Sequence, residues 1–263
     1  MGGIHMKIAI VTGASSGLGK EFVKQISRFY KELDEIWVIA RRQEPMEELK
    51  KSVPVEVRIF TGDLTEDLVY LQLKNRLENQ NPDIRMLVNA AGYGKIGTVE
   101  KLASTDPEKM YGMIDINCRA LTKMTCTCLS YMNPGSRIIN IASSAAFCPQ
   151  AKFAVYAATK SYVLSFSRAL AEELLDKKIY VTAVCPGPVN TEFFDVAGPS
   201  KFLTKKGMMS EAKDVVRQAL LDSRNKKGIS VYGLTMKCGR AAAKILPEAF
   251  SVRTLDKFNI IEE

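Results

Sequence analysis

Short apolar runs alternate with longer amphipathic stretches along the chain. The apolar runs are rich in β-branched residues, and continuous runs of this length are typical of strands that are covered on both faces of a sheet. Between them, apolar positions recur at helical spacing, as at Leu18, Phe22 and Ile26. We therefore expect strands at residues 7–11, 36–40, 55–60, 86–90, 137–142 and 180–185, and a short last strand at 228–233.

This alternation of strands and helices predicts the α/β class, with a doubly wound, mostly parallel sheet of the Rossmann type between two layers of helices. No linker, shift in composition or internal repeat divides the chain. We therefore expect a single domain over residues 6–263. Residues 1–5 precede a second methionine and show no periodicity, which is typical of an added leader rather than of the fold.

The composition is typical of a soluble globular protein, since 46% of the 263 residues are hydrophobic and 25% are charged. The net charge of +8 comes from dispersed lysines and arginines, which favours small anionic ligands over nucleic acid. No apolar run approaches the roughly 18 residues of a membrane span, and the six cysteines form no C-x-x-C pair. We therefore expect a cytoplasmic protein with free thiols and no nucleic-acid partner, and nothing in the composition favours contact with a membrane.

The chain has one histidine, His5, and it lies in the expected leader. A Ser-His-Asp or Cys-His triad is therefore excluded, and a zinc site that includes histidine is not expected. Catalysis has to rely on other side chains, and we expect no metal.

Three glycines, Gly13, Gly17 and Gly19, follow the first expected strand and open the first expected helix. Glycines in this position let the backbone turn sharply and approach a pyrophosphate, whose charge is met by the helix N-terminus. A glycine triplet alone is a weak indication. Its place between a strand and a helix favours a dinucleotide site.

The end of the second expected strand indicates which dinucleotide is bound. NAD-binding sites carry a carboxylate here, whereas this chain has Ala40 followed by Arg41 and Arg42. Two guanidinium groups can bind a phosphate bidentately, which favours NADP(H) over NAD(H), although arginines after a strand are also common on solvated surfaces. Asp63, after the third strand, is a candidate acceptor for the adenine amine or the N-cap of the next helix.

Tyr156 precedes Lys160 by four positions, so that on a helix the two side chains share one face. An adjacent ammonium that lowers the pKa of the phenol by about three units must supply roughly 4 kcal/mol. Tyr70 and Lys74 have the same spacing. Only Tyr156, however, has a hydroxyl partner, since Ser143 ends a strand at the carboxyl edge of the sheet, where ligands bind in such folds.

Together these motifs resemble those of the short-chain dehydrogenase/reductase family, in its non-extended branch of single-domain enzymes. The resemblance extends from residue 7 to about residue 233. It rests on TGASSGLG (12–19), Asp63, NAAG (89–92), Asn117, Ser143, YAATK (156–160) and PGPVNT (186–191), in the order and spacing of the family.

The resemblance implies a role for each residue of the catalytic set. Tyr156 would be the general acid or base, Ser143 would hydrogen-bond the substrate oxygen, and Lys160 would lower the pKa of Tyr156 and bind the nicotinamide ribose. Asn117 would join a proton relay behind Lys160. The implied cofactor-binding residues are Gly13, Ser15, Ser16, Gly17, Leu18, Gly19, Arg41, Arg42, Asp63, Leu64, Asn89, Ala90, Gly92, Tyr156, Lys160, Pro186, Gly187, Val189 and Thr191.

The chain departs from the family pattern in two places. Ala90 replaces the second asparagine of the usual N-N-A-G, which puts some rigidity of the adenosine pocket in doubt. Ser15 and Ser16 stand where many NADP-preferring relatives have a basic residue in the glycine loop. Arg41 would therefore carry most of the preference for NADP(H).

A segment at about 190–210 is rich in glycine, proline, aromatic residues and methionine, which predicts a lid over an apolar pocket, or else a buried excursion of the chain. The expected substrate is a small hydrophobic carbonyl compound or alcohol. The candidate substrate residues are Tyr93, Phe147, Phe193, Phe194, Phe202 and Met208. A C-terminal extension at about 234–263 could cover the pocket, join a subunit contact, lie on a membrane or pack on its own domain.

We therefore expect an NADP(H)-dependent carbonyl reductase or hydroxysteroid-type dehydrogenase. The alternatives are a 3-oxoacyl thioester reductase and a catalytically silent regulatory protein that binds NADP(H). A sugar-nucleotide epimerase would share the Tyr-Lys pair, but it usually needs a larger C-terminal domain. The resemblance also implies a homodimer or homotetramer that associates through the helix with Tyr156.

Overall fold

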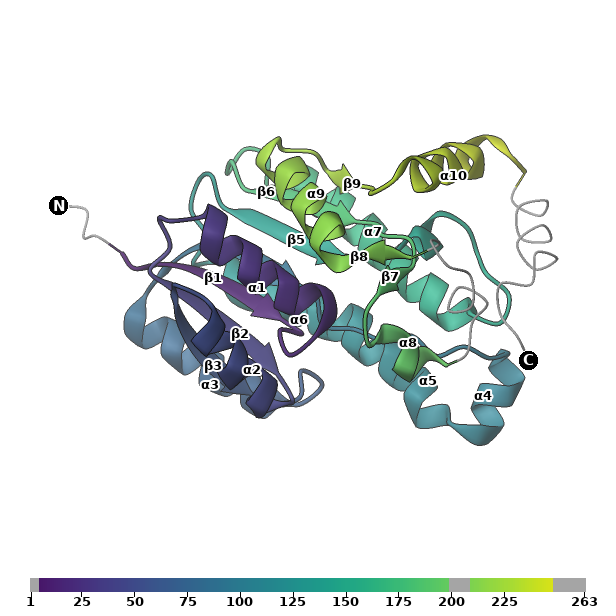
Figure 1. Cartoon of the computed structure of the whole chain (residues 1–263), viewed down its shortest axis with the longest axis horizontal. Helices are drawn as coiled ribbons and strands as arrows, with labels where there is room; N and C mark the ends of the chain where they lie inside the picture. The colour runs from purple at the N-terminus through teal and green to yellow at the C-terminus, as the bar shows by residue number, and fades with distance from the viewer. Residues whose placement is uncertain (1–4, 199–208, 248–263) are drawn as a thin grey trace.

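The computed structural model describes residues 5–198 and 209–247 (Figure 1). Two candidate substrate residues, Phe202 and Met208, lie outside the described residues, as do residues 1–4, 199–208 and 248–263 of the expected leader, lid and C-terminal extension. The described part of the chain contains a central sheet of seven strands in the order β3-β2-β1-β4-β5-β6-β9. Every neighbouring pair in this sheet is parallel.

Strands and helices alternate along the chain as the hydrophobic pattern predicts. The strands of the central sheet are β1 (Lys7–Thr12), β2 (Glu35–Ala40), β3 (Glu56–Thr61), β4 (Asp83–Asn89), β5 (Arg137–Ile141), β6 (Tyr180–Val184) and β9 (Ile229–Ser230). The helices that flank it are α1 (Gly17–Phe29), α2 (Gln43–Ser52), α3 (Asp67–Gln80), α6 (Leu121–Leu129), α7 (Ala154–Glu173) and α9 (Ala212–Arg224). All seven predicted strands are confirmed, although the last is only two residues long.

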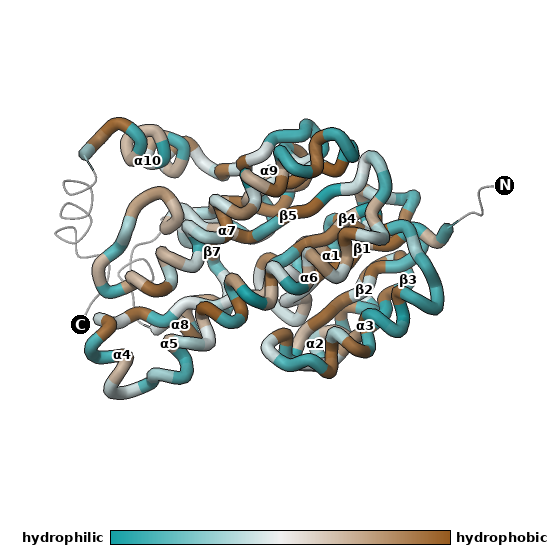
Figure 2. Tube along the Cα trace, turned by 180° about the vertical axis from the view of Figure 1, so that it is seen from behind, coloured by the Kyte–Doolittle hydropathy of each residue, from teal (hydrophilic) through white to brown (hydrophobic). Residues whose placement is uncertain are grey.

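Both faces of the sheet are apolar, because alternate residues of each buried strand point to opposite sides. Ala9 and Val11 of β1 belong to a core cluster that includes buried residues of α1, α2 and α9. Ile8 and Ile10 belong to a second cluster with residues of α3, α6 and α7. Figure 2 shows the hydrophobic strands between these two helical layers. The predicted three-layer, doubly wound fold is therefore confirmed.

The strand order reverses at β1, which pairs with β2 on one side and with β4 on the other. A reversal of this kind leaves a crevice at the carboxyl ends of the strands, where ligands bind in open α/β sheets. Thr12, Asn89 and Ile141 end β1, β4 and β5 at this edge. The loops that follow these strands therefore surround one site.

The remaining elements lie beyond this edge of the sheet. They are α4 (Val99–Thr105), α5 (Pro107–Ile114), η1 (Asp115–Ala120), η2 (Ser144–Phe147), β7 (Val189–Asn190), α8 (Phe193–Ala197), β8 (Ser210–Glu211) and α10 (Leu234–Ile245). None of the residues of α10 is buried, and this helix lies at the margin of the molecule (Figure 1). Among the described residues, no helix is both long and apolar enough to cross a membrane.

Candidate active site

A cleft of about 780 Å³ opens at the carboxyl edge of the sheet. It runs from the glycine loop after β1, past the loops after β2 to β5, to α7 and α8. The predicted residues that line it are Gly13, Ser15, Ser16, Gly17, Leu18, Gly19, Arg41, Arg42, Asp63, Leu64, Ala90, Gly92, Tyr93, Ser143, Tyr156, Lys160, Pro186, Val189, Thr191, Phe193 and Phe194. The fold therefore gathers most of the predicted site around one cavity.

Close backbone approaches in the glycine loop leave no room for side chains. Gly13 has a positive φ of 67°, and a Cβ there would lie 2.7 Å from the backbone nitrogen of Ala91. A Cβ on Gly19 would overlap the carbonyl oxygen of Gly13. Helix α1 begins at Gly17, so that its N-terminal N–H groups are next to the cleft. The loop therefore fits the pyrophosphate of a dinucleotide.

The loop after β4 is fixed without the missing family asparagine. Thr12 Oγ1 accepts hydrogen bonds from the backbone nitrogens of Ala90 and Ala91, each at 3.1 Å. Asn89 is buried behind the cleft, where its Nδ2 donates to Thr125 Oγ1 at 3.1 Å and to Asn140 Oδ1 at 2.9 Å. Asn89 therefore joins β4 to its neighbours, which differs from the predicted direct role in cofactor binding.

The two arginines after β2 lie at the mouth of the cleft, and each faces a carboxylate. Arg41 Nη1 is 3.8 Å from Asp63 Oδ2, and Arg42 Nη2 is 2.7 Å from Glu192 Oε2. Asp63 Oδ1 also accepts hydrogen bonds from the backbone nitrogen and the hydroxyl of Thr65, at 2.9 and 2.8 Å. Asp63 therefore shapes the turn before α3, whose N-cap residue is Glu66.

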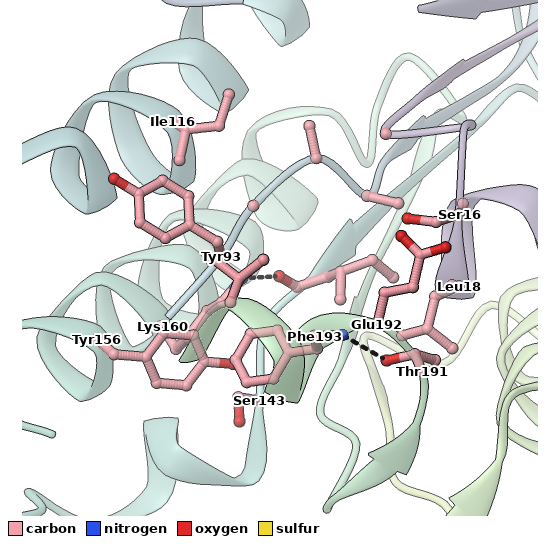
Figure 3. Close-up of a pocket in the computed structure, with 18 of the residues that line it drawn as sticks. Ser16, Leu18, Tyr93, Ile116, Ser143, Tyr156, Lys160, Thr191, Glu192 and Phe193 are labelled. Atoms are coloured by element: carbon pink, nitrogen blue, oxygen red, sulfur yellow. Dashed lines mark hydrogen bonds between the residues drawn. The ribbon is translucent and has the colours of Figure 1, made fainter. Parts of the chain in front are cut away.

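Ser143, Tyr156 and Lys160 come together in the cleft, as predicted (Figure 3). Ser143 is the N-cap of η2, where its Oγ accepts a hydrogen bond from the backbone nitrogen of Ala145 at 3.1 Å. Tyr156 and Lys160 lie one turn apart on α7, and both are buried. Lys160 Nζ donates to the carbonyl oxygen of Ile141 at 2.9 Å, which connects α7 to the end of β5.

Burial, rather than the neighbouring ammonium, dominates the pKa of Tyr156. Loss of solvent raises the pKa of this phenol to about 12, against a smaller lowering effect of its hydrogen bond with Ser143. Lys160 Nζ lies 5.6 Å from the centroid of the Tyr156 ring, and burial lowers the pKa of this ammonium to about 8. Burial therefore outweighs the lowering effect that was predicted from Lys160, and that effect stays a prediction.

Two phenylalanines pack against the ring of Tyr156. Phe153 stacks on it with the ring centroids 4.2 Å apart, and Phe193 tilts against it at 5.5 Å. A Cβ on Gly94 would lie 2.8 Å from the Cζ atoms of both phenylalanines, so that the loop backbone closes over this stack. Phe193 was a predicted substrate residue, but Phe153 was not, although it stands only three positions before Tyr156.

Asn117 lies behind the catalytic side chains, in the π-helical turn η1. Its Oδ1 accepts a hydrogen bond from the backbone nitrogen of Tyr93 at 3.1 Å. Its Nδ2 donates to the carbonyl oxygen of Tyr93 at 2.9 Å and to Thr159 Oγ1 at 3.0 Å. A Cβ on Gly92 would contact both Asn117 Oδ1 and Lys160 Nζ, so the two polar groups flank this glycine. The relay role of Asn117 stays a prediction.

Two further predicted residues do not line the cleft. Phe147 packs in a cluster with Val163 and Cys185, and the guanidinium of Arg240 in α10 lies 5.9 Å from its ring centroid. Phe147 is not among the described residues that line the cleft, so its substrate role stays a prediction. Gly187 faces α10, where a Cβ would lie 2.6 Å from the sulfur of Met236.

A glycine loop and a Ser, Tyr and Lys set at one edge of a parallel sheet define a dehydrogenase-type site. The family model described as short chain dehydrogenase matches residues 7–200. The chain therefore belongs to the short-chain dehydrogenase family, and it is an oxidoreductase of the kind that acts on CH–OH groups.

Several known proteins are similar to this chain over most of its length. Very-long-chain 3-oxoacyl-CoA reductase of Macaca fascicularis is 30% identical over 223 residues, which cover 82% of this chain and 69% of that protein. The 17-beta-hydroxysteroid dehydrogenase type 3 of Homo sapiens is 27% identical over 248 residues, which cover 90% and 72%. The structure of a short-chain dehydrogenase from Sphingobium yanoikuyae in complex with NADPH matches with a TM-score of 0.76 at 25% identity, covering 98% of this chain and 97% of that one.

Proposed function

We propose that the protein is an NADP(H)-dependent oxidoreductase that interconverts a hydrophobic ketone and its secondary alcohol, of the carbonyl reductase or hydroxysteroid dehydrogenase type. The observation that carries this proposal is the meeting of Ser143, Tyr156 and Lys160 with the glycine loop in one cleft. A catalytically silent protein that binds NADP(H) would have no need of all three side chains. Their joint presence favours an active enzyme.

The proposed reduction assigns a separate task to each of these side chains. When bound, NADPH supplies the hydride that reduces the carbonyl carbon. Tyr156 donates its phenolic proton to the carbonyl oxygen, and the Ser143 hydroxyl holds that oxygen in place. The raised pKa of Tyr156 keeps the phenol protonated at neutral pH, which is the form that reduction needs. Lys160 binds the nicotinamide ribose.

The proposed preference for NADP(H) rests on the residues at the end of β2. Ala40 stands at the position where NAD-binding sites have a carboxylate, so no negative charge repels the 2′-phosphate from this position. The side chains of Arg41 and Arg42 are 77% and 51% exposed at the cleft, so a phosphate can reach both guanidinium groups. The structure of the relative from Sphingobium yanoikuyae contains NADPH, which agrees with binding of this dinucleotide.

The proposed substrate class rests on the aromatic wall around Tyr156. Phe153, Phe193 and Phe194 line the cleft on this side, together with Ile96 and Val196. Such a wall favours a bulky apolar ketone, and the name of the similar hydroxysteroid dehydrogenase agrees with this. Reduction of a 3-oxoacyl thioester is the second candidate, because the 30% identical Macaca fascicularis protein is named for that reaction.

The test is oxidation of NADPH, followed by its absorbance, with steroid, aliphatic and acyl-thioester ketones. Turnover that is lost in Tyr156→Phe would support the proposal, and the best substrate would separate its two candidates. Tyr162→Phe is a matched control, since Tyr162 lies on α7 as well but is 42% exposed and bonded to Thr122. Binding of NADPH without turnover of any ketone class would instead favour the silent regulatory protein.

A further inference from the structure

An ion pair crosses the mouth of the cleft between two segments that are far apart in the sequence. Arg42 follows β2, and Glu192 directly precedes α8. Arg42 Nη2 donates to Glu192 Oε2 at 2.7 Å and lies 3.5 Å from Ser15 Oγ in the glycine loop. All three residues line the cleft. The pair therefore connects the glycine loop, the end of β2 and the start of α8.

Glu192 and the next residue point to different parts of the cleft (Figure 3). Phe193 points toward Tyr156, where the ketone would react. Glu192 points toward the side with Ser16 and Leu18, next to the glycine loop. The carboxylate of Glu192 is therefore on the cofactor side of the cleft and not on the catalytic side.

On the cofactor side, a carboxylate and a 2′-phosphate require the same partner. A guanidinium binds either group through charge-assisted hydrogen bonds, but a phosphate offers more charge and more acceptor oxygens. The Arg42 and Glu192 side chains are 51% and 55% exposed, and ion pairs with this exposure are weak enough to exchange. Arg41 has a looser carboxylate partner, since Asp63 lies 3.8 Å away. Competition is therefore strongest at Arg42.

We propose that Glu192 is a specificity-determining residue that competes with the 2′-phosphate of NADP(H) for Arg42, which limits the preference for NADP(H) over NAD(H). This inference rests on the proposed function. NAD(H) has a hydroxyl in place of the 2′-phosphate, so it binds without displacing Glu192. NADP(H) has to take Arg42 from the carboxylate, and part of its affinity is lost in that exchange.

The test is a titration of the protein with NADPH and with NADH in the absence of any ketone, followed by nucleotide fluorescence. Glu192→Gln keeps the size of the side chain and removes its charge. We expect this variant to bind NADPH about threefold more tightly or better, with a change of less than about twofold for NADH. Asp195→Asn is the matched control, since it removes the same charge from an exposed position of α8 and should change neither affinity.

A second pair of variants shows whether Glu192 acts through Arg42. In an Arg42→Met background, the further change Glu192→Gln should no longer strengthen NADPH binding. Equal strengthening in both backgrounds would mean direct repulsion of the phosphate and would overturn the inference. An unchanged NADPH affinity in Glu192→Gln, or an equal gain for NADH, would overturn it as well, while the proposed function would stand. A wild-type protein that binds neither nucleotide would overturn the proposed function and this inference together.

Discussion

Replacing Lys160 by methionine removes a buried ammonium and keeps a side chain of similar length. Lys160 is 5% exposed, and burial lowers its pKa from the ordinary value of 10.5 to about 8. The difference between these two values corresponds to about 3 kcal/mol. At neutral pH and below, Lys160 is charged in the folded and in the unfolded chain, and burying this charge lowers the free energy of unfolding of the cofactor-free protein by this amount.

The sign of this effect fixes its dependence on pH. Between about pH 8 and about pH 10.5, the unfolded chain still binds a proton at Lys160 that the folded protein has released, so stability rises with pH. From about pH 7 to about pH 9.5, the free energy of unfolding of the wild type should increase by about 2 kcal/mol relative to Lys160→Met. The shifted pKa of Tyr156 acts in both proteins and cancels in the comparison.

Urea unfolding of the cofactor-free proteins measures this difference, with the fluorescence of Trp37, the single tryptophan, as the probe. Both proteins are compared at the same concentration, so that any self-association contributes equally. Lys160→Met also loses the hydrogen bond to Ile141, but that loss applies at every pH. A stability difference that stays constant across this pH range would refute the burial of a charge at Lys160.

Three further predictions test other parts of the site. Gly19→Ala should abolish NADPH binding and lower the free energy of unfolding by about 1–3 kcal/mol, because the added Cβ meets backbone atoms. Gly228→Ala is the control, since no atom lies within 4 Å of its added Cβ, and it should leave binding and stability unchanged. Equal losses in the two variants would contradict the geometry of the glycine loop. The kcat/KM of alcohol oxidation by the wild type should rise from about pH 7 to about pH 9.5, because the raised pKa of Tyr156 keeps its phenolate, the base in this direction, scarce at lower pH. A flat kcat/KM profile over this range would contradict the role of Tyr156 as the base. Asn117→Ala should lower the midpoint of urea unfolding, with a loss of about 2–4 kcal/mol, since a buried side chain loses its three hydrogen bonds. An unaltered midpoint would show that these hydrogen bonds are dispensable.

Most of the fold could be predicted because its strands are short, continuous apolar runs with few competing interpretations. Most of β1 and the second half of β4 are buried, and the sequence marks them by the apolar runs IAIV (8–11) and MLV (86–88). The convergence of Ser143, Tyr156 and Lys160 could also be predicted, since a strand end and a helix next to it place them at the same edge. In these cases local sequence and tertiary structure agree.

The remaining features depend on contacts between distant segments. Glu192 pairs with Arg42 across 150 positions, and nothing in its local sequence indicates that partner. The pKa of Tyr156 follows from how completely the fold removes water from the phenol, which spacing alone does not reveal. Phe147 packs with Val163 and Cys185 and does not line the cleft, which its place in the sequence does not reveal.

Transfer of deuterium from NADPH that carries deuterium at both C4 positions of the nicotinamide tests the central claim most directly. The protein is incubated with the labelled cofactor and the ketone that gives the fastest NADPH oxidation, and the alcohol is analysed by mass spectrometry. Our account predicts one deuterium on the carbinol carbon with the wild type and with Tyr162→Phe, and no labelled alcohol with Tyr156→Phe. Labelled alcohol formed equally well by Tyr156→Phe would contradict the assignment of Tyr156 as the proton donor, and alcohol without deuterium would contradict direct hydride transfer.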